Sequence, residues 1–182
     1  MRQVISALGI ILAVGIVTYL VVGVRTVPLA PIDTYEYVSE TYGIAFDYPE
    51  GYVLEQGERG TGERRHYAIT LIKETDLPPA ANGEGPTAIT IDIYQNDIEN
   101  LSLNEWLTGT NQSNFKLGDG TYASTTVDGA SAVAYRWSGL YEGETTALIH
   151  KDNVVALSVT FLTPEDAIID VYRDILDSIG LK

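Results

Sequence analysis

The sequence contains no cysteine and only two histidines, His66 and His150. A chain without cysteine forms no disulfide framework, no zinc ribbon and no thiol nucleophile. Two histidines so far apart in sequence argue against a multi-histidine metal centre. Positive charge is also scarce, because 11 Lys and Arg face 25 Asp and Glu, for a formal net charge of −14. Phosphate binding needs clustered Lys and Arg, so we expect no nucleic-acid partner.

Charge is absent altogether from residues 4–24, which begin with Val4 and end with Val24. An apolar helix of this length spans about 31 Å at 1.5 Å per residue, which matches the hydrocarbon core of a bilayer. A cleaved signal peptide is the alternative, but its apolar core is usually about 7–15 residues. Its nearest cleavage point, after Ala30, would leave Pro31 first. We therefore expect an uncleaved transmembrane anchor over residues 1–25, in contact with the lipid bilayer.

The orientation of this anchor follows less directly, because Arg2 and Arg25 flank it almost symmetrically. All 25 acidic residues lie beyond position 32. A short N-terminal tail before a single anchor usually leaves the large C-terminal part outside the cytoplasm. We expect a single-pass protein of the cell membrane, with a cytoplasmic N-terminus and an extracytoplasmic C-terminal domain.

The remainder of the chain divides into a linker over residues 26–41, stiffened by Pro28 and Pro31, and one globular domain over residues 42–182. Alternating apolar and β-branched residues, separated by turn signals, predict a meander of antiparallel strands. The expected strands include residues 44–48, 66–73, 87–94, 130–138, 145–150 and 154–162.

Two helices interrupt and close this meander. Ser102 and Glu105 have capping-box spacing, so a short helix is expected over residues 102–109. A longer amphipathic helix is expected from Thr163 as N-cap and Pro164 as first helical residue, ending before Gly180. Its apolar stripe must cover one face of the sheet. The predicted class is α+β, an α/β/α sandwich around an antiparallel sheet of six or seven strands, preceded by one transmembrane helix.

Residues 42–52, YGIAFDYPEGY, resemble the opening strand of the PsbP-like domain family. That pattern has Gly and an apolar residue, then Phe-x-Tyr-Pro, then an aromatic residue that is usually Trp; here Tyr52 takes that place. The turn at residues 127–129 and the end of the last helix also resemble the family's later half, so the likeness covers residues 38–181. The resemblance implies the α/β/α sandwich named above. The family includes a photosynthetic extrinsic subunit and many anchored bacterial proteins, and the fold alone assigns no function.

Catalytic motifs are not evident in the sequence. Ser131 lacks the glycine pattern of a nucleophile elbow, residues 118–120 lead into no P-loop, and the glycines of residues 57–62 precede a strand rather than a helix. We therefore expect no enzyme, no catalytic residue and no cofactor. An envelope hydrolase without a recognisable motif is the third-ranked reading.

Two polar clusters suggest ligand binding instead. Asp92, Asp97 and Glu99 lie at a strand end and in the loop after it, where hard oxygen ligands would suit Ca²⁺, although the spacing of a dedicated calcium loop is missing. Residues 63–66, ERRH, are the only basic cluster in the sequence. They fit either the exposed start of a strand or a binding site for an anionic partner.

The sequence as a whole favours a membrane-anchored, non-catalytic domain that binds or scaffolds a protein partner at the cell envelope. The main alternative is a calcium- or small-ligand-binding module that uses Asp92, Asp97 and Glu99.

Overall fold

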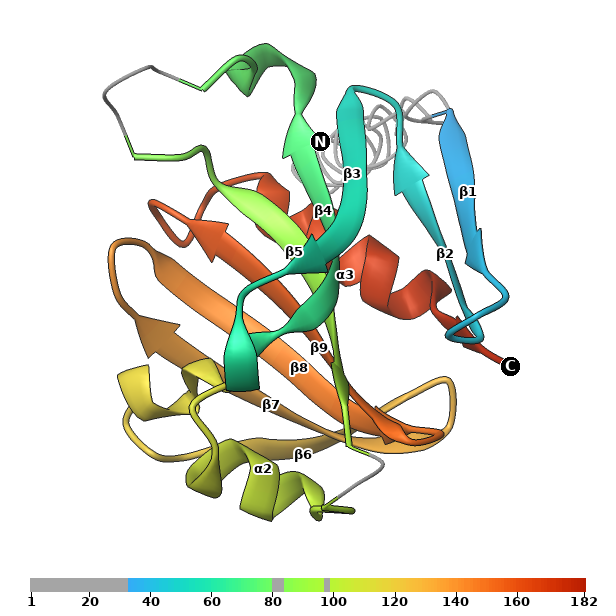
Figure 1. Ribbon diagram of the computed structural model, residues 1–182. Helices are drawn as coiled ribbons and strands as arrows, with labels where there is room; N and C mark the ends of the chain where they lie inside the picture. The colour runs from blue at the N-terminus through green and yellow to red at the C-terminus, as the bar shows by residue number, and fades with distance from the viewer. Residues whose placement is uncertain (1–32, 80–83, 97–98) are drawn as a thin grey trace, which may run out of the picture. The chain divides into compact units, whose positions relative to one another are not determined.

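A seven-stranded antiparallel sheet forms the centre of the domain in the computed structural model, which describes residues 33–79, 84–96 and 99–182. The strand order is β3-β4-β5-β9-β8-β7-β6 (Figure 1). The seven strands are β3 Tyr52–Arg59, β4 His66–Lys73, β5 Ala88–Gln95, β6 Ala123–Val127, β7 Ala130–Ser138, β8 Glu142–His150 and β9 Asn153–Phe161. Together with its helices, this sheet confirms the α+β class and the sheet size predicted from the sequence.

A second, three-stranded sheet contains β1 (Thr34–Ser39), β2 (Ile44–Pro49) and β10 (Gly180–Leu181). Strand β1 was expected to lie in the linker, but all six of its residues pair with β2, from Thr34 opposite Pro49 to Ser39 opposite Ile44. Aromatic stacking supports the pairing, with the Tyr37 and Phe46 ring centroids 5.0 Å apart. The domain therefore begins before residue 42, and Asp33–Lys182 forms one compact unit.

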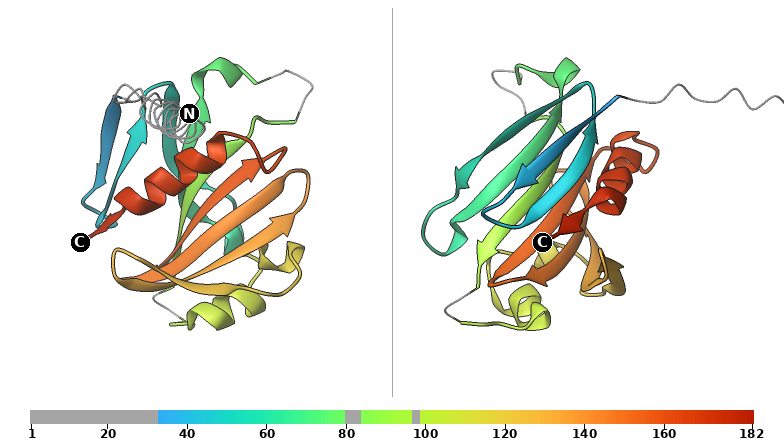
Figure 2. Two further views of the ribbon diagram at one scale, coloured as in Figure 1. Left: turned by 180° about the vertical axis from the view of Figure 1, so that it is seen from behind. Right: turned by 90° about the vertical axis from the view of Figure 1, so that its right-hand side faces the viewer.

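Helix α3 (Ile168–Ser178) lies across one face of the seven-stranded sheet (Figure 2). Its predicted stripe is confirmed, because Ile168, Tyr172 and Ile175 are buried in a core with the inward side chains of β5 and β9. Alternation divides the strands between two cores. Val155, Leu157 and Val159 face α3, whereas Val154 and Ala156 belong to the cluster on the opposite face.

The start of α3 differs from the prediction. The helix begins at Ile168 rather than at Pro164, and the residue before it, Ala167, provides no side-chain cap. The carboxylate of Asp166 accepts hydrogen bonds from the backbone N–H groups of Leu162 and Thr163 at 2.7 and 3.0 Å. Thr163 also donates its hydroxyl hydrogen to Asp166 at 3.1 Å. Thr163 therefore belongs to a turn organised by Asp166 instead of capping the helix.

The opposite face of the sheet carries helix α2 (Leu103–Gly109) and the 3-10 helix η3 (Asn114–Leu117). The predicted capping box is confirmed, since Ser102 and Glu105 satisfy each other's backbone N–H groups. Trp106, Leu107 and Phe115 pack against Tyr94, Tyr135 and Ala147 of the sheet in the second core. Two further 3-10 helices, η1 (Gly62–Arg64) and η2 (Glu74–Asp76), flank β4.

The expected transmembrane segment, residues 4–24, lies outside the described residues. Within the described part of the chain, no helix has the length and apolar character needed to cross a membrane.

Candidate functional site

Two adjoining hollows lie where α2 and η3 approach the start of β4. The larger, of about 860 Å³, is here called the α2 cleft, and its lining includes Tyr42, Arg65, Tyr67, Asn96, Glu99 and Trp106. The smaller, of about 530 Å³, is called the basic hollow, and its lining includes Arg64, Tyr94, Asn114, Lys116 and Leu117. Both hollows are bordered by His66, Asn111 and Gln112. His66 therefore stands at their common boundary.

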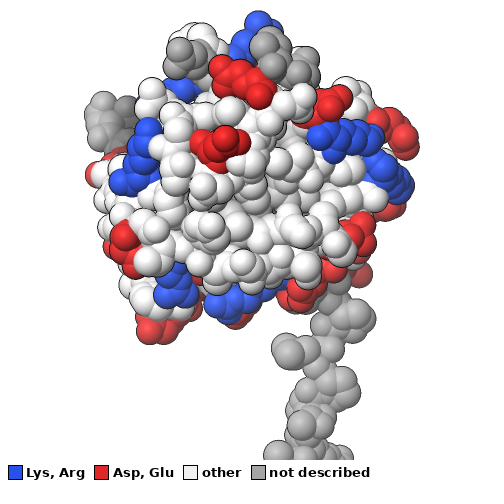
Figure 3. All heavy atoms as spheres, turned by 90° about the horizontal axis from the view of Figure 1, so that it is seen from below, with Lys and Arg blue, Asp and Glu red and all other residues white. Residues whose placement is uncertain are grey.

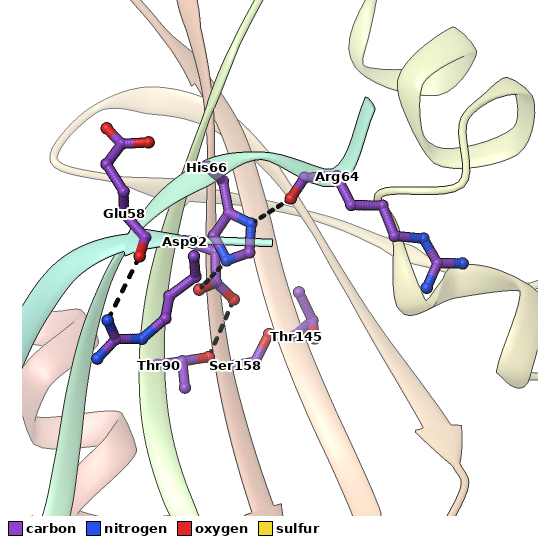
Figure 4. Close-up of polar contacts among 8 residues, drawn as sticks. Glu58, Arg64, His66, Thr90, Asp92, Thr145 and Ser158 are labelled. Atoms are coloured by element: carbon purple, nitrogen blue, oxygen red, sulfur yellow. Dashed lines mark hydrogen bonds and ion pairs between the residues drawn. The ribbon is translucent and has the colours of Figure 1, made fainter. Parts of the chain in front are cut away.

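Strand register brings His66 together with Asp92. Ala68 of β4 lies opposite Asp92 of β5, and His66 begins β4 two residues earlier, on the same face of the sheet. The Nε2 atom of His66 lies 3.3 Å from a carboxylate oxygen of Asp92, and Nδ1 lies 2.7 Å from the backbone oxygen of Arg64 (Figure 4). The other oxygen of Asp92 accepts a hydrogen bond from the Thr90 hydroxyl at 3.1 Å.

The contacts of His66 favour its charged form. A carbonyl oxygen and a carboxylate both accept hydrogen bonds, so the ring satisfies both partners only when both of its nitrogens carry hydrogen. The hydrogen bond to Asp92 raises the pKa of His66 above its ordinary value of 6.5, against the opposing effect of burial. The side chains of His66 and Asp92 are 16% and 20% exposed, so the ion pair is only partly screened by solvent. An imidazolium held in this way donates hydrogen bonds and is unsuited to act as a general base.

Stacked aromatic rings form the wall behind His66. The His66 and Tyr94 ring centroids are 4.6 Å apart, and Tyr94 packs in turn against Trp106 at 5.4 Å. The indole N–H of Trp106 donates to the side-chain oxygen of Gln112 at 2.6 Å. Burial raises the pKa of the Tyr94 hydroxyl, so that tyrosine stays neutral at physiological pH. The wall is therefore packed and hydrogen-bonded before any ligand arrives.

Hydroxyl groups continue across the same sheet face, where they bond to one another and to an indole. Thr145 and Ser158 share a hydrogen bond at 2.8 Å, and the indole N–H of Trp137 donates to Thr145 at 2.9 Å. Thr145 and Ser158 are nearly inaccessible, with exposed fractions of 1% and 6%. Activation of a serine requires a base in hydrogen-bond reach. The hydrogen bonds of His66 lead to Arg64 and Asp92 and not to these two hydroxyls.

The three predicted metal ligands have different places in the structure. Asp92 is engaged through both carboxylate oxygens, by His66 and Thr90. Glu99 borders the α2 cleft, and Asp97 lies outside the described residues. Across residues 33–79, 84–96 and 99–182, no group of three His, Cys, Asp or Glu side chains could hold a metal ion. The calcium site, which includes Asp97, remains a prediction.

Sequence reasoning did not find the pairing of His66 with Asp92. The two residues were assigned to separate clusters, because their proximity depends on which strands pair and in which register. The basic cluster at residues 63–66 was the signal available in the sequence. Arg65 and His66 of this cluster border the α2 cleft, and Arg64 and His66 border the basic hollow.

Charge is unevenly distributed over the domain surface. Seen from below, the domain has a broad centre of uncharged residues, with Lys, Arg, Asp and Glu gathered toward the rim (Figure 3). Several apolar side chains are exposed near η3 and the β7–β8 turn, with Leu117 53%, Tyr122 44% and Leu140 67% exposed. Exposed Leu and Tyr side chains gathered in one region are more typical of an interaction surface than of a fully solvated one.

Comparison with known proteins supports the fold. No family model matches the chain, and no curated protein sequence matches it. The solution structure of cyanobacterial PsbP (CyanoP) from Synechocystis sp. PCC 6803 is similar, with a TM-score of 0.57 and 10% identity, over 87% of this chain and 98% of that one. A mutant of the protein Mog1 gives a TM-score of 0.45 and 12% identity, over 82% of this chain and 96% of that one. The likeness to PsbP confirms the predicted fold and, at this identity, shows the fold alone.

Proposed function

We propose that this chain is a membrane-anchored, non-catalytic domain that binds a protein partner outside the cytoplasm, and that the α2 cleft is its binding site. The observation that carries the proposal is the state of His66. Its two ring nitrogens are occupied by Arg64 and Asp92, so His66 presents a fixed hydrogen-bond donor to the cleft and not a free imidazole base. A site of this kind can bind and orient a ligand without reacting with it.

The lining of the α2 cleft supports a protein as the ligand. Tyr42, Tyr67 and Trp106 border it, together with the amide side chain of Asn111 and the exposed guanidinium of Arg65. Tyrosine, tryptophan and arginine are enriched at protein interfaces, where they combine large contact area with hydrogen bonding. Trp106 is only 2% exposed, so it supports the floor, and the tyrosines and Arg65 supply accessible contacts.

Membrane anchoring rests on the uncharged residues 4–24. A single apolar segment of about 20 residues before an acidic globular domain is typical of an anchored extracytoplasmic protein. Anchoring would concentrate the domain at the membrane together with envelope partners, so that even a modest affinity gives substantial occupancy.

Site-specific photocrosslinking in intact membranes tests the proposal. A photoreactive amino acid at Asn111, an exposed position shared by both hollows, should capture one reproducible partner that mass spectrometry can identify. The matched control places the same amino acid at Asp174, on the exposed side of α3. Arg65→Glu combined with the Asn111 probe should abolish the capture. Equal capture from Asn111 and Asp174, or none from Asn111, would contradict the proposal.

A further inference from the structure

The basic hollow reverses the charge balance of the chain. Acidic residues outnumber basic ones by 25 to 11 in the sequence, yet the charged lining residues that the structure describes here are Arg64, His66 and Lys116. Asn111, Gln112, Ser113 and Asn114 add amide and hydroxyl groups to the lining. A hollow of about 530 Å³ whose charged lining residues are all basic is suited to a negatively charged group.

The two flexible cations of the hollow are not neutralised by the rest of the domain. Four other arginines, Arg59, Arg65, Arg136 and Arg173, form ion pairs with Glu55, Glu58, Glu144 and Asp170 respectively. Among the described side chains, neither Arg64 nor Lys116 forms an ion pair, and Lys116 contacts the amide oxygen of Asn111 at 3.5 Å. Figure 4 shows the Arg64 side chain extending away from Asp92. These two charges are available to an incoming anion.

Local structure fixes where these cations lie. Arg64 ends η1, and its backbone oxygen is held by Nδ1 of His66 at 2.7 Å. Lys116 belongs to η3, whose first turn is capped by Ser113 through a hydrogen bond from the Phe115 N–H at 2.9 Å. Phe115 packs edge-on against Tyr135 of the sheet, with the two ring centroids 5.2 Å apart. Both backbones are therefore anchored to the sheet, and only the side chains must adjust to a ligand.

We infer that the basic hollow binds a carboxylate side chain of an acidic segment in the partner protein. The inference rests on the proposed function, because it names the part of the partner that the site recognises. An arginine guanidinium can donate two parallel hydrogen bonds to one carboxylate, and Lys116 adds a second charge-assisted donor.

A peptide fits this site better than a small free anion. The basic hollow shares His66, Asn111 and Gln112 with the larger α2 cleft, so an extended segment can occupy both at once. Leu117, which is 53% exposed, borders the basic hollow and offers an apolar contact beside the cations. A free anion would use the cations alone.

Titration calorimetry at low salt tests the inference with the full-length chain in a non-ionic detergent. The probe is a capped hexaglutamate peptide, and capped hexaglutamine is the uncharged comparison. The net charge of −14 repels hexaglutamate as a whole, so binding requires a local basic site. We expect hexaglutamate to bind and hexaglutamine not to bind. The Arg64→Gln, Lys116→Gln double variant should lose about tenfold or more in affinity.

The matched control is the Arg136→Gln, Arg173→Gln double variant, which removes the same amount of charge from two exposed ion pairs elsewhere. It should bind hexaglutamate within about twofold of the natural chain. Equal losses in both double variants, or no binding of hexaglutamate at all, would overturn the inference. So would inorganic phosphate that binds as tightly as the peptide, because the site would then be one for free anions.

Failure of this inference is distinguishable from failure of the proposed function. Hexaglutamate binding that depends on Arg64 and Lys116, without a partner captured at Asn111, would support the acidic-segment site and contradict the cellular role. Capture of a partner at Asn111 that persists in the Arg64→Gln, Lys116→Gln variant would support the role and reject the carboxylate contact.

Discussion

His66 connects the start of β4 to β5 through an ion pair that requires a charged imidazole. Because the pKa of His66 is raised in the folded chain, folding stabilises the protonated ring. That stabilisation is fully present below a pH of about 6.5, the ordinary pKa, and is lost as the pH rises through the folded-state pKa. We expect the free energy of unfolding to decrease over this interval in the natural chain.

The His66→Gln variant should not show this decrease, since glutamine does not titrate. Urea unfolding from about pH 5 to about pH 9 measures the difference between the two proteins. His150→Gln is the matched control, because it removes the other histidine of the chain. A decrease of the same size in His66→Gln would show that the ion pair with Asp92 does not control the pH dependence.

Calcium binding at Asp92, Asp97 and Glu99 is testable separately. A Ca²⁺ ion bound to the folded chain alone would raise Tm by mass action, equivalent to about 2.7 kcal/mol at a hundredfold excess over Kd. The ion would have to share Asp92 with His66, which already lies 3.3 Å away. If this site binds Ca²⁺, Asp97→Asn should abolish the Tm increase measured in millimolar Ca²⁺. An unchanged increase in that variant would reject the assignment.

The polar residues show why the site was only partly predictable. Composition and local pattern placed a basic cluster at residues 63–66 and carboxylates at the end of β5 and in the loop after it. The link between them depends on strand pairing and register, which place Ala68 opposite Asp92. A local pattern does not specify which strand pairs with which, so sequence reasoning found the two groups without their contact.

Among the secondary-structure elements, those with strong internal patterns were predicted well. Strand β7 covers the predicted residues 130–138, and α2 has both arms of its predicted capping box. One error falls where a distant strand decides the conformation, and another where a local turn replaces the expected cap. All six positions of strand β1 are exposed or half-exposed, so its alternation is weak, and the strand forms because β2 pairs with it. The residues before α3 match a capping pattern, yet Asp166 holds them as a turn.

Substitution of Phe46 in β2 tests whether the three-stranded sheet is part of the main core. Its side chain is 1% exposed, stacks on Tyr37 and belongs to the same core as α3. Phe46→Ala should reduce the free energy of unfolding by about 3–5 kcal/mol, as truncation of a buried aromatic does. Leu162→Ala, at a position that is 68% exposed, should change it by less than about 0.5 kcal/mol. Similar losses in the two variants, measured by urea unfolding, would show that β2 lies outside the cooperative core.

Helix α3 packs on the same core through its apolar stripe, against β2 and β9. Ile175 is fully buried, so Ile175→Asp would place an unpaired carboxylate against β2 and β9. We expect this variant to lose the cooperative unfolding transition at ordinary temperature. Asp174→Asn changes the neighbouring exposed position and should leave the transition unchanged. An unaltered unfolding midpoint for Ile175→Asp would refute the docking of α3.

The proposed role of the whole molecule depends on which side of the membrane the domain occupies. The absence of cysteine makes this measurable, because any introduced thiol is the only one in the chain. Asp174→Cys lies on the exposed side of α3, and Gln3→Cys precedes the apolar residues 4–24. With an extracytoplasmic domain, a membrane-impermeant maleimide should label Asp174→Cys in intact cells, but label Gln3→Cys only after permeabilisation.

The reverse labelling pattern would place the domain in the cytoplasm and contradict the proposed role at the envelope. The Gln3→Cys variant also distinguishes an anchor from a cleaved signal peptide. Cleavage after Ala30 would remove the label from the mature chain, whereas an uncleaved anchor keeps label and domain in one polypeptide of full mass. A retained label in the membrane fraction after alkaline carbonate extraction would support integral anchoring, since that treatment releases proteins held only by surface charge. Anchoring and orientation together decide whether the α2 cleft can meet an envelope partner.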